Sequence, residues 1–381
     1  MLAPRPQRYG SGSESGSLTL DATGNGPPLP RANPNLLGHE GAERALRRLF
    51  QSGRMPHAVL MTGPRGIGKA TLAYRFARFV LTHGATADGA VLPTDDDLLA
   101  IPPDCGVFRR IASGGHADLL VVERAFDSRR RRLRSEIVVD DTREITAFMR
   151  LTAAEGGWRV VIVDGADEMN RSAANALLKI LEEPPRHALL LLVAHSPGRL
   201  LPTIISRCRR LPMTPLPSSI VSRIIQTYRP DLPPADFTAL IALADGSIGR
   251  AIELVEAGGV ELYRAILGLL SGEHGLDPTA LQGLADRLAR GEADSAYRAV
   301  EELLSHVLGE IAVYAAGGGT GRQFSPDSDR ILRRLCARAP AARWAELRGQ
   351  IAAIFARGNA LNLDRKQTIL GAFFAIERIA R

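Results

Sequence analysis

The 381-residue sequence contains little cysteine, few aromatic residues and no long apolar run. Its three cysteines are too few and too scattered for a disulfide framework, which fits a reducing compartment, and we expect the cytoplasm. The longest purely apolar stretch, residues 188–194, is far shorter than the roughly 20 residues that a membrane-spanning helix needs. Aromatic residues make up only 5%, which argues against stacking platforms for single-stranded nucleic acid. We therefore expect neither a secreted disulfide scaffold nor a membrane protein.

Charge is mildly basic and is carried almost entirely by arginine. Lys and Arg total 48 against 41 for Asp and Glu, which gives a net charge of +7. The lysines are Lys69, Lys179 and Lys366. A chain of this size with this charge tolerates polyanions as partners but does not require them.

The pattern of apolar residues divides the chain into three regions. Residues 1–34 are rich in proline and glycine and predict a disordered tail. Short apolar runs at 57–62, 119–122, 137–139, 160–163 and 189–193 then alternate with helical periodicity at 43–53, 70–81, 142–152 and 172–183. This alternation predicts a mostly parallel sheet with helices on both faces. Past residue 217 strand patterns vanish, so the remaining sequence predicts an all-helical region.

The strongest motif is a G-x4-G-K run between an expected strand and an expected helix, formed by Gly63, Gly66, Gly68 and Lys69. In such a loop the backbone N–H groups turn toward phosphate and the lysine reaches the terminal phosphates. The next residue should be Ser or Thr, whose hydroxyl holds magnesium, but here it is Ala70. Thr71 follows, yet on a helix it points about 100° away. We therefore expect phosphate binding with weakened magnesium binding.

The second motif is an apolar strand that ends in Asp164, as the metal-assisting strand of such nucleotidases does. An active enzyme of this type has a glutamate next, which orients the attacking water, and this chain has Gly165. Asp167 and Glu168 lie two and three residues too late to project from the strand end at the same angle. An aspartate that begins a turn after a core strand is the alternative reading of Asp164.

These residues, with Asn-Ala-Leu-Leu-Lys-x-Leu-Glu-Glu-Pro-Pro at 175–185, Ser-Arg-Cys at 206–208 and Gly-Ser-Ile-Gly-Arg-Ala at 246–251, resemble the delta-prime subunits of the bacterial DNA polymerase III clamp loader. The resemblance covers about residues 35–255. It implies an α/β P-loop AAA+ module at 35–213, a helical lid at 214–262 and a helical collar at 263–381 that mediates oligomerisation. It also implies a hetero-pentamer with tau/gamma and delta subunits, which opens a sliding clamp and places it on primed DNA.

The resemblance further assigns roles to two arginines. Arg207 corresponds to an arginine finger that acts in trans on a neighbour's γ-phosphate, and Arg250 to the lid arginine that contacts nucleotide. The alternative for Arg207 is an ordinary surface ion pair, and for Arg250 a helix-start arginine of the lid. Since Ala70 and Gly165 disable the chain's own site, whereas Arg207 serves only another, we expect a subunit that can hold ATP but does not hydrolyse it.

The family often carries a four-cysteine zinc module between the loop and the second carboxylate. In that stretch this chain offers Cys105 and His116, and one thiol with one imidazole cannot complete a tetrahedral site. We expect no zinc there and no other metal site. A run of arginines at 129–132 with Arg134 predicts a solvated hairpin more readily than a contact with DNA.

Two other functions remain open at this point. One is an ATP-hydrolysing motor subunit of the same complex, similar to tau/gamma, in which Thr71 and Asp167 replace the missing groups. The other is a basic AAA+-like protein that binds nucleic acid outside replication.

Overall fold

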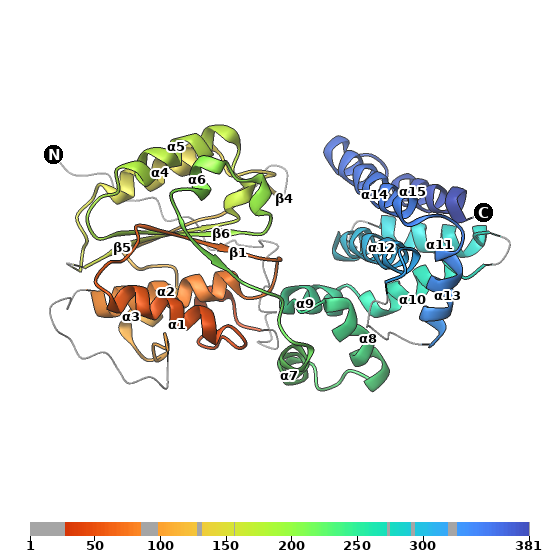
Figure 1. The fold of residues 1–381 in the computed structure, drawn as a ribbon, viewed down its shortest axis with the longest axis horizontal. Helices are drawn as coiled ribbons and strands as arrows, with labels where there is room; N and C mark the ends of the chain where they lie inside the picture. The colour runs from red at the N-terminus through yellow and green to blue at the C-terminus, as the bar shows by residue number, and fades with distance from the viewer. Residues whose placement is uncertain are drawn as a thin grey trace. The chain divides into compact units, whose positions relative to one another are not determined.

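The computed structural model describes residues 27–84, 98–127, 132–155, 157–272, 275–290, 294–318 and 326–380. They belong to two compact units, Met1–Ile220 and Val221–Arg381, of which the first is α/β and the second helical (Figure 1). The expected division of the second region into a lid and a collar at residue 262 stays a prediction.

A parallel sheet forms the centre of the first unit. Within the described residues it has five strands in the order β2-β5-β6-β1-β7, with every neighbouring pair parallel. The strands are β1 (Ala58–Thr62), β2 (Leu119–Val122), β5 (Arg159–Asp164), β6 (Ala188–Ala194) and β7 (Arg209–Pro212). The short strands β3 (Phe126–Asp127) and β4 (Arg132–Leu133) pair separately and antiparallel. The parallel α/β fold predicted from the sequence is confirmed.

Helices cover both faces of this sheet (Figure 1). One face carries α1 (Glu40–Gln51), α2 (Lys69–His83) and α3 (Gly106–Ala112), and the other carries α4 (Val139–Met149), α5 (Arg171–Glu182) and α6 (Pro202–Ile205). Successive strand residues alternate between the two cores. Val59 and Met61 pack in the core under α1 to α3, whereas Ala58 and Leu60 pack in the core under α4 to α6. Both sides of the central strands are buried, which explains their continuous apolar runs.

The structure differs from the expected strands at two places. Residues 137–139 form no strand: Ile137 makes a single bridge to Met169, and α4 begins at Val139 because the Val138 N–H donates to the Asp141 carboxylate at 2.8 Å. Strand β7 was not predicted, because this edge strand carries exposed arginines and has no apolar run to reveal it. Of the arginine cluster, residues 129–131 lie outside the described residues.

The predicted tail ends earlier than residue 34. Residues 30–32 form a short 3-10 helix, and the Arg78 guanidinium donates to the carbonyls of Arg31 at 3.0 Å and Asn33 at 2.7 Å. Arg78 is only 1% exposed and lies over the Phe108 ring. A buried guanidinium thus binds the backbone carbonyls of this segment, a contact that composition could not reveal. Residues 1–26 of the predicted tail lie outside the described residues.

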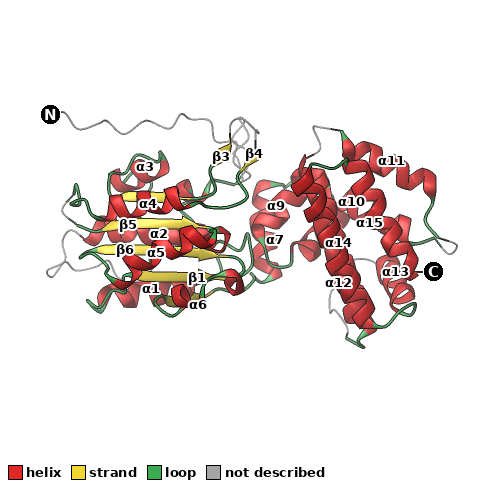
Figure 2. Cartoon of the chain, turned by 90° about the horizontal axis from the view of Figure 1, so that it is seen from above, coloured by secondary structure: helices red, strands yellow, loops and turns green. Residues whose placement is uncertain are grey.

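The second unit is helical, as predicted. Helix α7 (Ser218–Tyr228) spans the boundary between the units, and Figure 2 shows the helices that follow it. They are α8 (Pro234–Ala244), α9 (Ile248–Glu256), α10 (Gly259–Leu270), α11 (Pro278–Ala289), α12 (Asp294–Ala315), α13 (Pro326–Cys336), α14 (Ala341–Leu361) and α15 (Arg365–Ala380). Trp344, Phe355 and Phe373 are fully buried among them. In the described part of the chain, none of the helices has the length and apolarity to cross a membrane.

Candidate functional site

The carboxyl ends of the parallel strands bring the candidate residues of the first unit to one edge of the sheet. The glycine-rich loop follows β1, Asp164 ends β5, and His195 follows β6, which lies between them. In the ladder Thr62 is opposite Ala194, and Asp164 is opposite Val193. This edge is where open α/β sheets bind ligands.

The loop has a backbone shape that requires its glycines. Gly63, Gly66 and Gly68 have φ values of +148°, +76° and +107°, a region that side chains disfavour. A Cβ atom at Gly63 would lie 2.3 Å from the carbonyl oxygen of Met213. Helix α2 begins at Lys69, directly after the loop, so its unpaired N–H groups face the same place. The backbone therefore fits the phosphate group that the sequence motif predicts.

The side chain of Lys69, the first residue of α2, is bound to this loop. Its ammonium donates to the carbonyl oxygens of Gly63 at 2.7 Å and Pro64 at 2.5 Å, and the residue is 3% exposed. Burial lowers the pKa of Lys69 to about 8, against the opposing effect of the nearby Asp164 and Asp167 carboxylates. A phosphate in the loop would have to draw this ammonium away from carbonyls that already satisfy it.

Residues 36–39, which the sequence analysis did not connect with the loop, contact it. The His39 ring nitrogen Nε2 lies 2.6 Å from the Ile67 carbonyl oxygen, and Leu36 lies against Gly68. His39 is 6% exposed, and this burial lowers the pKa of its imidazole. The sequence gave no local signal for this contact, which joins residues 28 positions apart.

The position after Lys69 does not fit a magnesium ion. Ala70 has no side-chain oxygen, and Thr71 is buried one position further round the helix. The residues present therefore fit phosphate but not the metal that normally accompanies it.

Asp164 lies in a position that disfavours its charge. Burial and, second in effect, the carboxylate of Glu123 raise the pKa of Asp164 to about 6, although Lys69 acts in the opposite direction. Glu123 directly follows β2, so it reaches the same edge of the sheet. The sequence analysis overlooked Glu123, although its place after an apolar strand was a sufficient signal.

Asp167 has a structural task. Its two carboxylate oxygens accept hydrogen bonds from the backbone N–H groups of His195 at 2.9 Å and Ser196 at 2.8 Å. The residue is 6% exposed. Both oxygens are thus engaged in holding the turn after β6, and the arrangement does not favour Asp167 as a replacement for the missing catalytic glutamate.

Glu168 is nearer to the strand end than its sequence position suggested. A Cβ atom at Gly165 would lie 2.6 Å from the Glu168 Oε2, because Gly165 turns the chain back with a φ of +83°. The Glu168 carboxylate is, however, paired with Arg124 at 2.8 Å. The space beside Gly165 therefore contains a carboxylate, but one whose charge is already balanced by an arginine.

His195 directly follows β6, the strand between the loop and Asp164. Burial, with Lys69 next in effect, lowers the pKa of His195 to about 4. Among the described residues its Nδ1 atom is buried without a hydrogen-bond partner. It therefore presents a neutral imidazole at the edge of the sheet.

Arg207 lies just after α6 at the surface of the first unit. Its Nη2 atom is 2.9 Å from the Glu182 Oε1, and its Nη1 atom donates to the Thr203 carbonyl at 3.1 Å. The Arg207 side chain is 37% exposed, so it is accessible to another molecule. The sequence analysis did not single out Glu182 as its partner.

Arg250 belongs to the second unit, in the first turn of α9. Its backbone N–H donates to the Ser247 hydroxyl at 3.1 Å, which caps this helix. This contact uses only the backbone of Arg250, and contact of its side chain with nucleotide stays a prediction.

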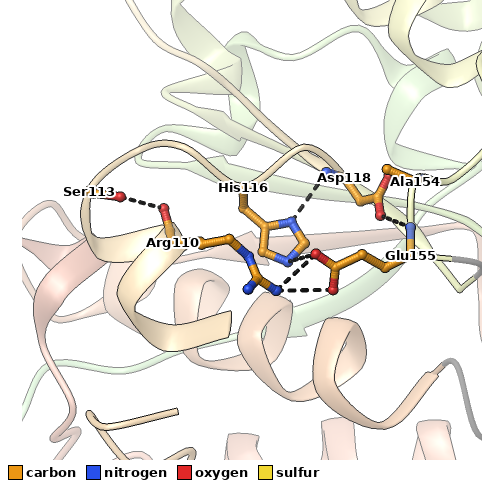
Figure 3. A network of polar contacts seen from close by, with 6 residues as sticks. All are labelled: Arg110, Ser113, His116, Asp118, Ala154 and Glu155. Atoms are coloured by element: carbon orange, nitrogen blue, oxygen red, sulfur yellow. Dashed lines mark hydrogen bonds and ion pairs between the residues drawn. The ribbon is translucent and has the colours of Figure 1, made fainter. Parts of the chain in front are cut away.

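Polar contacts connect residues 110–118 with residues 154–155 (Figure 3). Arg110 of α3 pairs with Glu155 at 2.8 Å, and the His116 Nε2 lies 3.9 Å from the same carboxylate. Asp118 accepts from the N–H groups of Ala154 at 2.7 Å and Glu155 at 3.0 Å. Among the described residues no group of three His, Cys, Asp or Glu side chains could hold a metal ion. The absence of zinc stays a prediction.

The first unit of the chain is similar to known proteins. The family model described as "DNA polymerase III, delta subunit" matches residues 38–217. This match covers just under half of the chain. The chain is 38% identical over 192 residues to DNA polymerase III subunit delta' of Pseudomonas aeruginosa, a match that covers 50% of this chain and 53% of that protein.

Two further proteins have lower sequence identity to this chain. The tau/gamma subunit of Haemophilus influenzae is 29% identical over 232 residues, which cover 60% of this chain and 31% of that protein. A solved structure from Thermotoga maritima, described as a DNA polymerase III gamma subunit-related protein, has 18% identity and a TM-score of 0.41, and covers 89% of this chain and 100% of its own. The chain spans about half the length of the delta' relative, so the match does not extend to that whole protein.

Proposed function

We propose that this chain is a delta-prime-type subunit of a bacterial DNA polymerase III clamp loader that does not hydrolyse ATP. In this role it presents Arg207 across a subunit interface to the ATP bound by a neighbouring motor subunit. The family match at residues 38–217 and the 38% identity to a delta' subunit support the complex. The chain's own glycine-rich loop lacks groups for hydrolysis, whereas Arg207 is exposed. This contrast supports a subunit that assists hydrolysis at another subunit without hydrolysing ATP itself.

That contrast carries the proposal. On the chain's own loop, Ala70 offers no oxygen to magnesium, Asp167 is held by two backbone N–H groups, and Glu168 is paired with Arg124. The exposed Arg207 guanidinium, in contrast, is supported at the surface of the unit. A site that lacks hydrolytic groups beside an intact exposed arginine makes chemical sense in an oligomer, where the arginine stabilises charge on another subunit's phosphate.

The glycine-rich loop retains a more limited role in this proposal. Its backbone N–H groups and Lys69 bind the phosphates of a nucleotide, which is ATP in the working complex, without a tightly held magnesium ion. No step of hydrolysis is assigned to the loop. Zinc has no place in the proposed function.

The partners follow from the proposed family role. The chain assembles with tau/gamma and delta subunits into a hetero-pentamer in the bacterial cytoplasm, and the second unit contributes its collar to the ring. The complex opens the sliding clamp and places it on primed DNA. The chain's mild basicity allows it to lie near DNA, and the aromatic-poor composition does not suggest a separate platform for single strands.

The test is ATP hydrolysis by a loader reconstituted with Arg207→Ala. We expect the DNA-stimulated rate to fall at least about tenfold, toward the 10³-fold or greater effect of arginine fingers elsewhere. Size-exclusion chromatography should show an unchanged complex, because Arg207 lies at the surface and supports no core. An undiminished rate would contradict the finger.

One observation favours the motor alternative, namely the Glu168 carboxylate beside Gly165. If Glu168 orients water, the purified chain should hydrolyse ATP and Lys69→Ala should abolish that activity. We expect no turnover above background in either protein.

A further inference from the structure

The side chain of Arg207 is supported by two neighbouring segments of the first unit. Its Nη1 atom donates to the Thr203 carbonyl in α6 at 3.1 Å and lies 3.5 Å from the Ser206 hydroxyl oxygen. Its Nη2 atom lies 2.9 Å from the Glu182 carboxylate, at the last residue of α5. The two ends of the guanidinium are therefore fixed by different elements.

The residues on either side of Arg207 complete this support. The Ser206 hydroxyl donates to the same Thr203 carbonyl at 3.1 Å. Cys208 packs against the core between the sheet and α4 to α6, and burial raises the pKa of its thiol to about 12, so the thiol stays neutral. Within the Ser-Arg-Cys sequence, the Ser206 hydroxyl therefore binds the same carbonyl as Arg207, the Arg207 guanidinium is exposed, and the Cys208 side chain packs against the core.

We propose that Glu182 is a positioning residue for Arg207, which holds the guanidinium extended from the surface so that it meets a neighbour's phosphate already oriented. This inference rests on the proposed finger role of Arg207. Arginine has a flexible side chain whose freedom must be lost when it binds phosphate. A carboxylate that restricts it beforehand reduces that loss, in the same way that other preorganised groups favour the transition state.

The geometry allows Glu182 and a phosphate to be contacted together. A guanidinium has five N–H bonds in a planar fork, and the described contacts engage three of them at most. Both partners are solvent-accessible, at 37% for Arg207 and 51% for Glu182, so the pair is weak enough to adjust when phosphate arrives. A buried pair would hold the arginine too firmly for that.

The experiment compares reconstituted loaders that carry Glu182→Ala, Glu183→Ala, Arg207→Ala or the Glu182→Ala/Arg207→Ala pair. Glu183 is the matched control, because it is an adjacent exposed glutamate for which the structure gives no contact with Arg207. We expect Glu182→Ala to slow DNA-stimulated hydrolysis by about two- to fivefold, the range that an exposed ion pair supports. Glu183→Ala should retain the rate of the unaltered loader.

Two further readouts separate positioning from a merely structural effect. The double variant should be no slower than Arg207→Ala alone, because Glu182 acts only through the arginine. The difference in hydrolysis rate between Glu182→Ala and the unaltered loader should also shrink as salt rises from about 0.05 to about 0.5 M. Salt screens the ion pair between Glu182 and Arg207 in the unaltered protein. Thermal unfolding and assembly of each variant should match the parent.

The outcomes distinguish the inference from the function on which it rests. Undiminished hydrolysis with Arg207→Ala would overturn the finger role itself. A slow Arg207→Ala loader beside a Glu182→Ala loader that equals Glu183→Ala, or exceeds the parent rate, would overturn only the positioning role. An additional loss in the double variant would also overturn it, because Glu182 would then act independently of Arg207.

Discussion

The Lys69 ammonium donates a 2.7 Å hydrogen bond to the carbonyl oxygen of Gly63, six residues earlier in the same loop. The group that should contact phosphate is therefore bound to its own loop, in surroundings that lower the Lys69 pKa to about 8. Binding of an anion requires the charged ammonium, so the affinity of the loop depends on the proton that Lys69 carries.

Binding of ATP to the purified chain should weaken as the pH rises above 8. Below pH 8 Lys69 is charged in the unliganded chain, and above it each pH unit costs up to about tenfold in affinity, because binding must first restore the proton. Isothermal titration calorimetry from pH 6.5 to 9.5 measures this directly. The exposed Lys179 supplies the control, since Lys179→Ala should keep the pH profile and Lys69→Ala should lose it. A flat profile in the unaltered chain would contradict a phosphate-binding role for Lys69.

Asp164→Asn should stabilise the protein at pH 7.5. The folded pKa of Asp164, about 6, lies above the ordinary 3.8, so the folded state binds more protons between these values and its stability falls as pH rises through them. Above pH 6 the Asp164 carboxylate is charged in the folded state and lowers the free energy of unfolding by its full amount. Removing this charge should raise the free energy of unfolding by about 1–3 kcal/mol. Urea unfolding at pH 4 and pH 7.5 checks both parts: the gain should appear at pH 7.5 and fade at pH 4. A loss of stability at pH 7.5 would contradict the unfavourable charge.

Asp167→Ala should destabilise the first unit far more than Glu168→Ala. The Asp167 carboxylate satisfies the N–H groups of His195 and Ser196, and leaving them unpaired costs about 3 kcal/mol. Glu168 loses only a partly exposed pair with Arg124, worth about 1 kcal/mol or less. Thermal unfolding of the two variants gives the comparison. Equal melting temperatures would show that Asp167 does not hold this turn.

Arg78→Met should loosen the segment before α1. The methionine fills much of the space but cannot donate to the carbonyls of Arg31 and Asn33. We expect faster hydrogen exchange and easier proteolysis at residues 29–34, with a loss of about 2 kcal/mol of stability. The exposed Arg48→Met is the control and should change neither. Unchanged exchange in Arg78→Met would mean that other contacts hold this segment.

The sequence predicted those strands and turns that are determined by residues close together in the chain. Residues 58–62 and 188–194 are buried on both faces and therefore read as apolar runs, and the glycines of the loop mark positive φ values. Strand β7 escaped prediction because an edge strand can carry exposed arginines. The sequence predicted a mostly parallel sheet but not the order of its strands, which places the loop and Asp164 at one edge.

The contacts between distant residues could not be predicted in the same way. Glu182 and Arg207 are 25 positions apart, and only the fold places α5 beside the end of α6. The nearness of Glu168 to the strand end depends on the left-handed turn at Gly165, which the sequence analysis treated only as a missing glutamate. The buried Arg78 corrected the expected limit of the tail for the same reason, because its carbonyl partners lie more than 40 residues away.

We propose that the glycine-rich loop of this chain does not hydrolyse ATP and that Arg207 assists hydrolysis in a neighbouring subunit. One comparison of DNA-stimulated ATP hydrolysis tests both parts. Loaders reconstituted with Lys69→Ala and with Arg207→Ala in this chain are measured at saturating ATP beside the unaltered complex. We predict that Lys69→Ala leaves the rate within about twofold, while Arg207→Ala lowers it at least about tenfold. The reverse pattern, with hydrolysis lost in Lys69→Ala and retained in Arg207→Ala, would show that this chain consumes ATP itself.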